Sequence, residues 1–162
     1  MKEKIIAMIP ARMGSSRYPG KPIIDIKGKT MIEHVWQRVR LNARIDDIYI
    51  ATCDEEIKTV AKSFGAKVIM TASDHERCSD RVAEACRKLM DQGEDFDIIL
   101  NIQGDEPLLH PNSLDLLIEP FLREKNIAAV NLIETLETSE EINNTNNVKA
   151  IFDQNGFALY FS

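Results

Sequence analysis

Short apolar runs alternate along the chain with segments whose apolar residues recur every three or four positions. The short runs are rich in isoleucine, valine and other residues that favour strands, and they cover residues 4–10, 47–52, 67–71 and 97–102. The segments with helical spacing cover residues 31–41, 55–64, 80–90 and 112–124. The first run is almost continuously apolar, as expected for a strand that is buried on both faces of a sheet.

Strands that alternate with helices in this way predict βαβ units. The predicted fold class is therefore α/β, with three layers: a mainly parallel sheet and helices on both of its faces. Thr30 is placed to cap the first helix, and Gly65 is placed to end the second. Pro120 lies inside the fourth helix and predicts a kink or a shortened helix.

The last third of the chain has a weaker pattern. Further strands are predicted over residues 127–133, 148–152 and 157–162, with a hairpin turn at Asn155-Gly156. Residues 135–147 are acidic and rich in asparagine, which predicts a solvated loop with room for one helical turn. The chain of 162 residues is long enough for one domain with a substantial core, so residues 1–162 are predicted to form a single domain.

Composition and charge exclude several function classes. A net charge of −6 argues against general nucleic-acid binding, which rewards basic surfaces. No apolar run approaches the roughly 20 residues that span a bilayer, so no membrane insertion is expected. Cys53, Cys78 and Cys86 are odd in number and form no CxxC pair. They are typical of free thiols in a cytoplasmic protein rather than of a disulfide framework or a zinc site.

The loop after the first predicted strand, residues 11–22, is the first candidate for chemistry, because ligands of open parallel sheets bind beyond the carboxyl ends of the strands. It carries Arg12, Arg17 and Lys21 and no acidic residue. Its glycines and serines add backbone N–H groups and hydroxyls, so the loop could cradle a triphosphate. A surface loop with scattered cations has the same composition and remains the alternative.

Two familiar nucleotide-binding motifs do not fit this loop. Five residues rather than four separate Gly14 from Gly20, and Lys21 is followed by Pro22 instead of serine or threonine. The Walker A motif is therefore disfavoured, since its magnesium-binding hydroxyl is absent. The GxGxxG fingerprint of a dinucleotide site is absent as well.

A second candidate lies directly after the fourth predicted strand, in the run Asn-Ile-Gln-Gly-Asp-Glu-Pro at residues 101–107. Asp105, beside Gly104, is well placed to hold a Mg²⁺ ion that bridges phosphates. A turn in which Asp105 bonds its own backbone is the alternative. The cationic loop at the same edge of the sheet favours the magnesium site.

Several motifs together resemble one enzyme family. They are found at residues 9–12, 19–22, 28–35, 51–52, 70–71, 80–81, 101–107 and 158–162. These segments resemble the CMP-Kdo synthetases, or 3-deoxy-manno-octulosonate cytidylyltransferases. The first loop is also similar to that of sialic-acid cytidylyltransferases, but Gln-Gly-Asp-Glu-Pro and the last segment resemble the Kdo enzymes more narrowly.

The resemblance implies a Rossmann-like nucleotidyltransferase fold and a homodimer. It also implies a reaction, transfer of CMP from CTP to the anomeric hydroxyl of Kdo for lipopolysaccharide biosynthesis, with release of pyrophosphate. Arg12 and Lys21 would grip the CTP phosphates with support from Ser15 and Arg17, and Asp105 would bind Mg²⁺. The remaining residues that it places against the nucleotide or the sugar are Pro10, Ala11, Ser79, Asp80, Arg81 and Gln103.

The chain departs from the family in three ways. Family members continue into a region with a second metal-binding aspartate, so the resemblance implies a C-terminally incomplete chain, and a non-catalytic nucleotide-binding protein is one alternative. Arg77-Cys78-Ser79 replaces the family's Ser-Gly-Thr, which makes an amino-Kdo or another sugar acid a second alternative. Cys53 replaces an acidic residue, and we interpret it as a small buried side chain beside a helix start.

Overall fold

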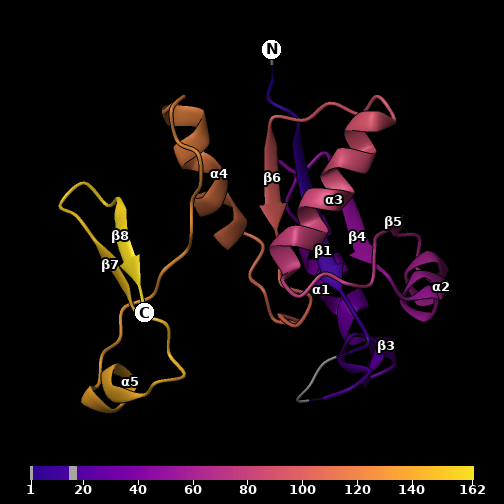
Figure 1. Cartoon of the computed structure of the whole chain (residues 1–162), viewed down its shortest axis with the longest axis horizontal. Coiled ribbons are helices and arrows are strands. Elements are labelled where there is room, and N and C mark those ends of the chain that lie inside the picture. The colour runs from indigo at the N-terminus through magenta and orange to yellow at the C-terminus, as the bar shows by residue number, and fades with distance from the viewer. Residues whose placement is uncertain (1, 15–17) are drawn as a thin grey trace. The chain divides into compact units, whose positions relative to one another are not determined.

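The computed structural model describes residues 2–14 and 18–162, which fall into two compact units, Met1–Ile127 and Ala128–Ser162. The first unit is an α/β structure, and the second holds a hairpin and a short helix (Figure 1). A single nucleotide-binding domain over residues 1–162 stays a prediction. None of the described helices is long and apolar enough to cross a membrane.

A four-stranded parallel sheet forms the centre of the first unit. Its strands, in spatial order, are β5 (Lys67–Met70), β4 (Asp47–Thr52), β1 (Ile5–Ala11) and β6 (Ile98–Asn101). All seven residues of β1 are buried, because β1 has neighbours on both sides and helices over both faces. This position explains its nearly continuous apolar sequence and confirms the predicted α/β fold class.

Four helices connect and cover the strands. They are α1 (Met31–Arg40), α2 (Glu55–Ser63), α3 (Cys78–Asp91) and α4 (Ser113–Arg123). The predicted cap is confirmed, since the Thr30 side chain accepts a hydrogen bond from the Glu33 backbone N–H. Gly65 follows α2 with a φ of 85°, the left-handed conformation that favours glycine at a helix end.

Alternate residues of β1 contribute to two separate hydrophobic cores, as the pleat of a strand requires. Ile5, Ala7 and Ile9 pack in a core with apolar residues of α1, α2 and α4. Ile6 and Met8 pack with apolar residues of α3, the helix that crosses in front of the strands in Figure 1. The sheet therefore lies between two helical layers, which confirms the predicted three-layer arrangement.

Three short elements follow the first loop and were not predicted. They are the 3₁₀ turn η1 (Lys21–Ile23) and an antiparallel pair of two-residue strands, β2 (Asp25–Ile26) and β3 (Lys29–Thr30). Two residues are too few to show a period of hydrophobic positions.

The second unit contains α5 (Ser139–Asn143) and an antiparallel hairpin of β7 (Ala150–Phe152) and β8 (Ala158–Phe161). Gly156 in the hairpin turn has a φ of 85°, as the Asn-Gly signal predicts. The predicted strand over residues 127–133 is wrong, because this segment has no regular structure. No described strand pairs with it, and its Leu132 and Ile133 are exposed, so its apolar pattern has no sheet to join.

Candidate functional site

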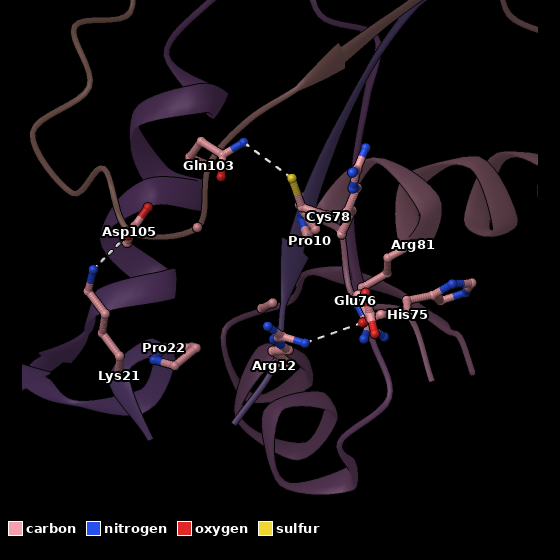
Figure 2. Close-up of a pocket in the computed structure, with 13 residues that line it drawn as sticks. Pro10, Arg12, Lys21, Pro22, His75, Glu76, Cys78, Arg81, Gln103 and Asp105 are labelled. Atoms are coloured by element: carbon pink, nitrogen blue, oxygen red, sulfur yellow. Dashed lines mark hydrogen bonds and ion pairs between the residues drawn. The ribbon is translucent and has the colours of Figure 1, made fainter. Parts of the chain in front are cut away.

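A pocket of about 270 Å³ lies at the carboxyl ends of β1 and β6 (Figure 2). Four segments converge on it: the end of β1, the start of η1, the loop between β5 and α3 together with the first turn of α3, and the loop after β6. The lining residues are Pro10, Ala11, Arg12, Lys21, Pro22, His75, Glu76, Arg77, Cys78, Arg81, Gln103, Gly104 and Asp105. Parallel strands end at one edge of a sheet, which is why loops distant in sequence meet here.

Local hydrogen bonds fix the described part of the first loop. The Met13 backbone N–H donates to Asp54 Oδ2 at 2.8 Å, which ties this loop to the start of α2. The Gly20 N–H donates to the Met13 carbonyl oxygen at 3.0 Å, and Gly20 adopts a φ of 75° that favours glycine. These bonds return the chain to the sheet edge, so that Lys21 lies at the pocket.

Lys21 and Asp105 face each other in the pocket, with Nζ and Oδ2 2.6 Å apart (Figure 2). Their side chains are 37% and 49% exposed, and ion pairs this exposed contribute at most about 1 kcal/mol to stability. An incoming polyanion can therefore replace Asp105 as the partner of Lys21. The carboxylate is then free to bind a cation.

Gly104 lies in close contact with the end of β1. A Cβ at this position would lie 2.9 Å from the Pro10 carbonyl oxygen, a contact that real side chains essentially never make. The Ile102 N–H donates to the Met8 carbonyl oxygen at 2.9 Å, so the loop after β6 continues along β1 before it turns away. The glycine allows this approach and places Asp105 opposite the first loop.

The loop between β5 and α3 forms another wall of the pocket. Arg12 Nη1 donates to the His75 carbonyl oxygen at 3.3 Å. Arg81 is only 2% exposed, and its Nη1 donates to Thr71 Oγ1 and, at 3.1 Å, to the Ala72 carbonyl oxygen. Arg81 Nη2 is buried and has no hydrogen-bond partner among the described residues, which costs free energy.

The pocket lining has a surplus of positive charge, in a chain whose net charge is −6. Its cationic side chains are Arg12, Lys21, Arg77 and Arg81, and its carboxylates are Glu76 and Asp105. Gln103 Nε2 lies 3.7 Å from Cys78 Sγ and joins the loop after β6 to the first residue of α3. The arrangement suits an anionic ligand with a cation bound beside it.

The structure brings most of the predicted site residues together. Those that line the pocket are Pro10, Ala11, Arg12, Lys21, Arg81, Gln103 and Asp105. Ser79 and Asp80 do not line it, although they directly follow Cys78 in α3, and Ser15 and Arg17 lie outside the described residues. The roles of all these residues stay predictions.

Four lining residues had no site role predicted from the sequence: Pro22, His75, Glu76 and Gly104. Arg77 and Cys78 were predicted only as departures from the family that change the choice of substrate, and both line the pocket. A signal for residues 75–78 was present, because they follow the carboxyl end of β5 and belong to the same edge of the sheet.

A family model described as cytidylyltransferase matches residues 6–162. The chain belongs to the cytidylyltransferase family. The chain is 42% identical over 160 residues to the 3-deoxy-manno-octulosonate cytidylyltransferase of Thermodesulfovibrio yellowstonii, covering 97% of the chain and 62% of that relative. It is 43% identical over 159 residues to the 8-amino-3,8-dideoxy-manno-octulosonate cytidylyltransferase of a Shewanella species, covering 98% of the chain and 64% of the relative.

Among solved structures, the chain resembles a CMP:2-keto-3-deoxy-manno-octonic acid synthetase complexed with CTP. The TM-score is 0.86 at 35% sequence identity, with 98% of this chain and 64% of the other covered. The chain thus spans somewhat less than two thirds of the length of these relatives. The structural likeness agrees with the predicted nucleotidyltransferase fold.

Proposed function

We propose that the pocket binds CTP together with Mg²⁺, and that the protein transfers CMP to the anomeric hydroxyl of Kdo or a closely related sugar acid. The observation that carries the proposal is the Lys21–Asp105 pair of 2.6 Å in one pocket with Arg12 and Arg81. The similar structure with bound CTP and the relatives named for Kdo support it.

Arg12 and Lys21 would bind the triphosphate. In the reaction the anomeric hydroxyl loses its proton to solvent and its oxygen bonds to the α-phosphorus. The bond from that phosphorus to the oxygen bridging to the β-phosphate breaks, and pyrophosphate leaves with the bonding electrons. Negative charge grows on the phosphoryl oxygens and the leaving group during this displacement, so fixed cations stabilise the transition state more than the ground state. Removal of one such group commonly costs a hundredfold or more in rate.

The residues present fit a magnesium ion. Among the described residues no three His, Cys, Asp or Glu side chains gather as a metal cluster, so Asp105 would act with oxygen atoms of the nucleotide and water. Mg²⁺ is commonly held in this way, by one or two carboxylates and substrate phosphates. When bound, Mg²⁺ would neutralise charge on the phosphates. Lys21 would release Asp105 for this purpose.

The remaining lining residues would hold the nucleoside. Pro10, Ala11 and Gln103 form an uncharged part of the pocket beside the cations. Arg81 would add a buried positive charge at the wall of the pocket. Ser79 and Asp80 do not line the pocket, and their contact with the nucleotide or the sugar stays a prediction.

The binding test is calorimetric titration of the chain with CTP in the presence of Mg²⁺. We expect Lys21→Ala to weaken CTP binding about tenfold to a hundredfold, the range for losing a charge-assisted hydrogen bond. Lys62→Ala on α2 removes the same charge from an exposed site away from the pocket and serves as the matched control. Equal affinities of the two variants and the unmutated chain would overturn the proposal.

A second titration tests the metal site. Asp105→Asn should weaken binding of CTP in Mg²⁺ but not in EDTA, because only the metal-bound complex needs the carboxylate. A loss of equal size in both buffers would contradict the assignment of Asp105 to the metal.

Substrate identity is tested by pyrophosphate release from CTP with Kdo, its 8-amino analogue and sialic acid. Two observations favour the 8-amino sugar as a second candidate: a relative named for it, and Glu76 in the pocket, whose carboxylate could pair with an ammonium group. CTP binding without product from any of the three sugars would favour a non-catalytic nucleotide-binding role.

The homodimer stays a prediction, and sedimentation analysis of the protein in solution would test it.

A further inference from the structure

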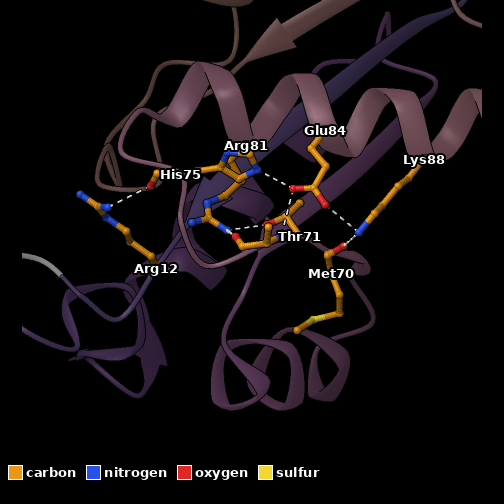
Figure 3. Close-up of polar contacts among 8 residues, drawn as sticks. Arg12, Met70, Thr71, His75, Arg81, Glu84 and Lys88 are labelled. Carbon is orange, nitrogen blue, oxygen red and sulfur yellow. Dashed lines mark hydrogen bonds and ion pairs between the residues drawn. The ribbon is translucent and has the colours of Figure 1, made fainter.

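One polar face of α3 is directed at the loop that forms the wall of the pocket. Arg81, Glu84 and Lys88 are spaced three and four residues apart, so they lie on the same side of the helix. Val82, Ala85 and Leu89 of α3 pack instead in the hydrophobic core against the sheet. Figure 3 shows the three polar side chains extending from α3 toward the chain after β5.

Glu84 makes the most contacts of the three. Its Oε2 accepts a hydrogen bond from the Ala72 backbone N–H at 2.9 Å and lies 2.5 Å from Nε2 of His75. Its Oε1 lies 2.8 Å from Lys88 Nζ. The Glu84 side chain is 17% exposed and that of His75 is 18% exposed, so the contact between these two side chains is largely shielded from water.

Arg81 and Lys88 bind the same stretch of chain on either side of Glu84. Arg81 donates to the Ala72 carbonyl oxygen at 3.1 Å, and Lys88 donates to the Met70 carbonyl oxygen at 2.8 Å. Side chains of α3 thus bind three backbone groups of residues 70–72 directly. Loops on a protein surface are mobile unless such bonds hold them.

The same loop reaches Arg12 through His75. Glu84 binds the His75 ring, and the His75 carbonyl oxygen accepts the hydrogen bond from Arg12 Nη1. In Figure 3 the chain of contacts runs from Glu84 through His75 to Arg12. Movement of His75 would therefore release the guanidinium that the proposed function assigns to the phosphates.

Glu84 is held in its charged form. Hydrogen bonds from Lys88 and then from His75 lower the pKa of the Glu84 carboxyl to about 2, so it is ionised at neutral pH. An ionised carboxylate accepts stronger hydrogen bonds than a neutral one, which suits a group that anchors a backbone N–H.

We propose that Glu84 is a positioning residue for nucleotide binding: it fixes the loop of residues 71–77 and, through His75, orients Arg12 in the pocket. This inference rests on the proposed function, because it takes CTP as the nucleotide that Arg12 binds. Glu84 lies outside the pocket lining and touches no ligand in this scheme.

A double-mutant cycle with Arg12 separates positioning from general destabilisation. Glu84→Leu should weaken CTP binding about tenfold in the unmutated background and less than twofold in the Arg12→Ala background, because its effect passes through Arg12. Glu119→Leu removes a helix carboxylate that pairs with Arg44 away from the pocket, and should leave CTP affinity unchanged. Equal tenfold losses from Glu84→Leu in both backgrounds would overturn the inference.

Glu84→Gln keeps an oxygen that can accept from the Ala72 N–H and His75, and should retain CTP affinity within about threefold. This variant also tests the proposal if Glu84→Leu fails to fold. A loss as large as that expected for Glu84→Leu would contradict the role of these two hydrogen bonds.

Amide hydrogen exchange tests the loop without nucleotide. Ala72 should exchange at least tenfold faster in Glu84→Leu than in the unmutated chain, while amides of β1 keep their protection. If the unmutated chain fails to bind CTP, the proposed function and this inference both fall. Intact CTP binding with unchanged Ala72 exchange would overturn only the role of Glu84.

Discussion

Gly104→Ala perturbs the pocket at the point where the loop after β6 lies closest to β1. The added Cβ would lie 2.9 Å from the Pro10 carbonyl oxygen and 3.6 Å from Ile9 Cγ2. Gly104 does not have the positive φ that favours glycine, so the substitution acts through this contact and not through backbone strain. An ordinary contact begins at 3.4 Å, so something must move by about 0.5 Å.

The loop is the part that moves, because β1 is bonded on both sides within the sheet. Overpacking of this kind commonly costs about 1–3 kcal/mol of unfolding free energy. The shift also carries Asp105 away from Lys21, now 2.6 Å distant, and misplacement by an ångström can cost about a hundredfold in function. We therefore expect CTP affinity to fall at least tenfold.

Urea unfolding and CTP calorimetry measure the two effects. Gly14→Ala is the matched control for stability, since a Cβ there would meet none of the described residues within 4 Å and its φ is not positive. It should leave the unfolding free energy unchanged or raise it by up to about 1 kcal/mol. If Gly104→Ala is as stable as Gly14→Ala and binds CTP as tightly as the unmutated chain, the close contact with Pro10 does not constrain the loop.

Two further predictions concern the thiols and the acid limit of stability. An aromatic disulfide reagent should label exposed Cys78 first, half-buried Cys53 later and Cys86 last, because burial shields Cys86 and raises the pKa of its thiol. CTP should slow the labelling of Cys78 only. Labelling of Cys86 in the folded chain as fast as that of Cys78 would contradict its burial. A hydrogen bond from Lys88 is the main reason that the pKa of Glu84 lies at about 2, below its ordinary value of 4.5, so the ionised carboxylate stabilises the fold above pH 4.5. At most about 3 kcal/mol of unfolding free energy is lost as the pH falls from 4.5 to 2. The unfolding free energy of Glu84→Gln should depend less on pH in this range, and the same dependence as in the unmutated chain would contradict the low pKa of Glu84.

The sequence predicted the parts of the fold whose pattern is long and regular. β1 was predictable because a strand buried on both faces needs apolar residues at successive positions. The meeting of Lys21 with Asp105 was predictable for a topological reason, since both follow parallel strands that end at one edge of the sheet.

Other features depend on tertiary context that no local pattern carries. The apolar segment 127–133 looks like a strand, but strand formation requires a partner, and the described chain supplies none. Arg81 was predicted as a ligand contact, yet its Nη1 donates hydrogen bonds to Thr71 and Ala72, because α3 lies over the loop that precedes it. The contact between Glu84 and His75 depends on the path of that same loop.

The most direct test of a CTP site at the carboxyl ends of β1 and β6 is an amide NMR titration with CTP and Mg²⁺. We expect the largest shifts at Ala11, Lys21 and Gly104, which line the pocket. Shifts confined to the groove around Trp36 and Lys67, at the amino ends of the strands, would contradict a CTP site at the carboxyl ends, as would no shifts at saturating CTP.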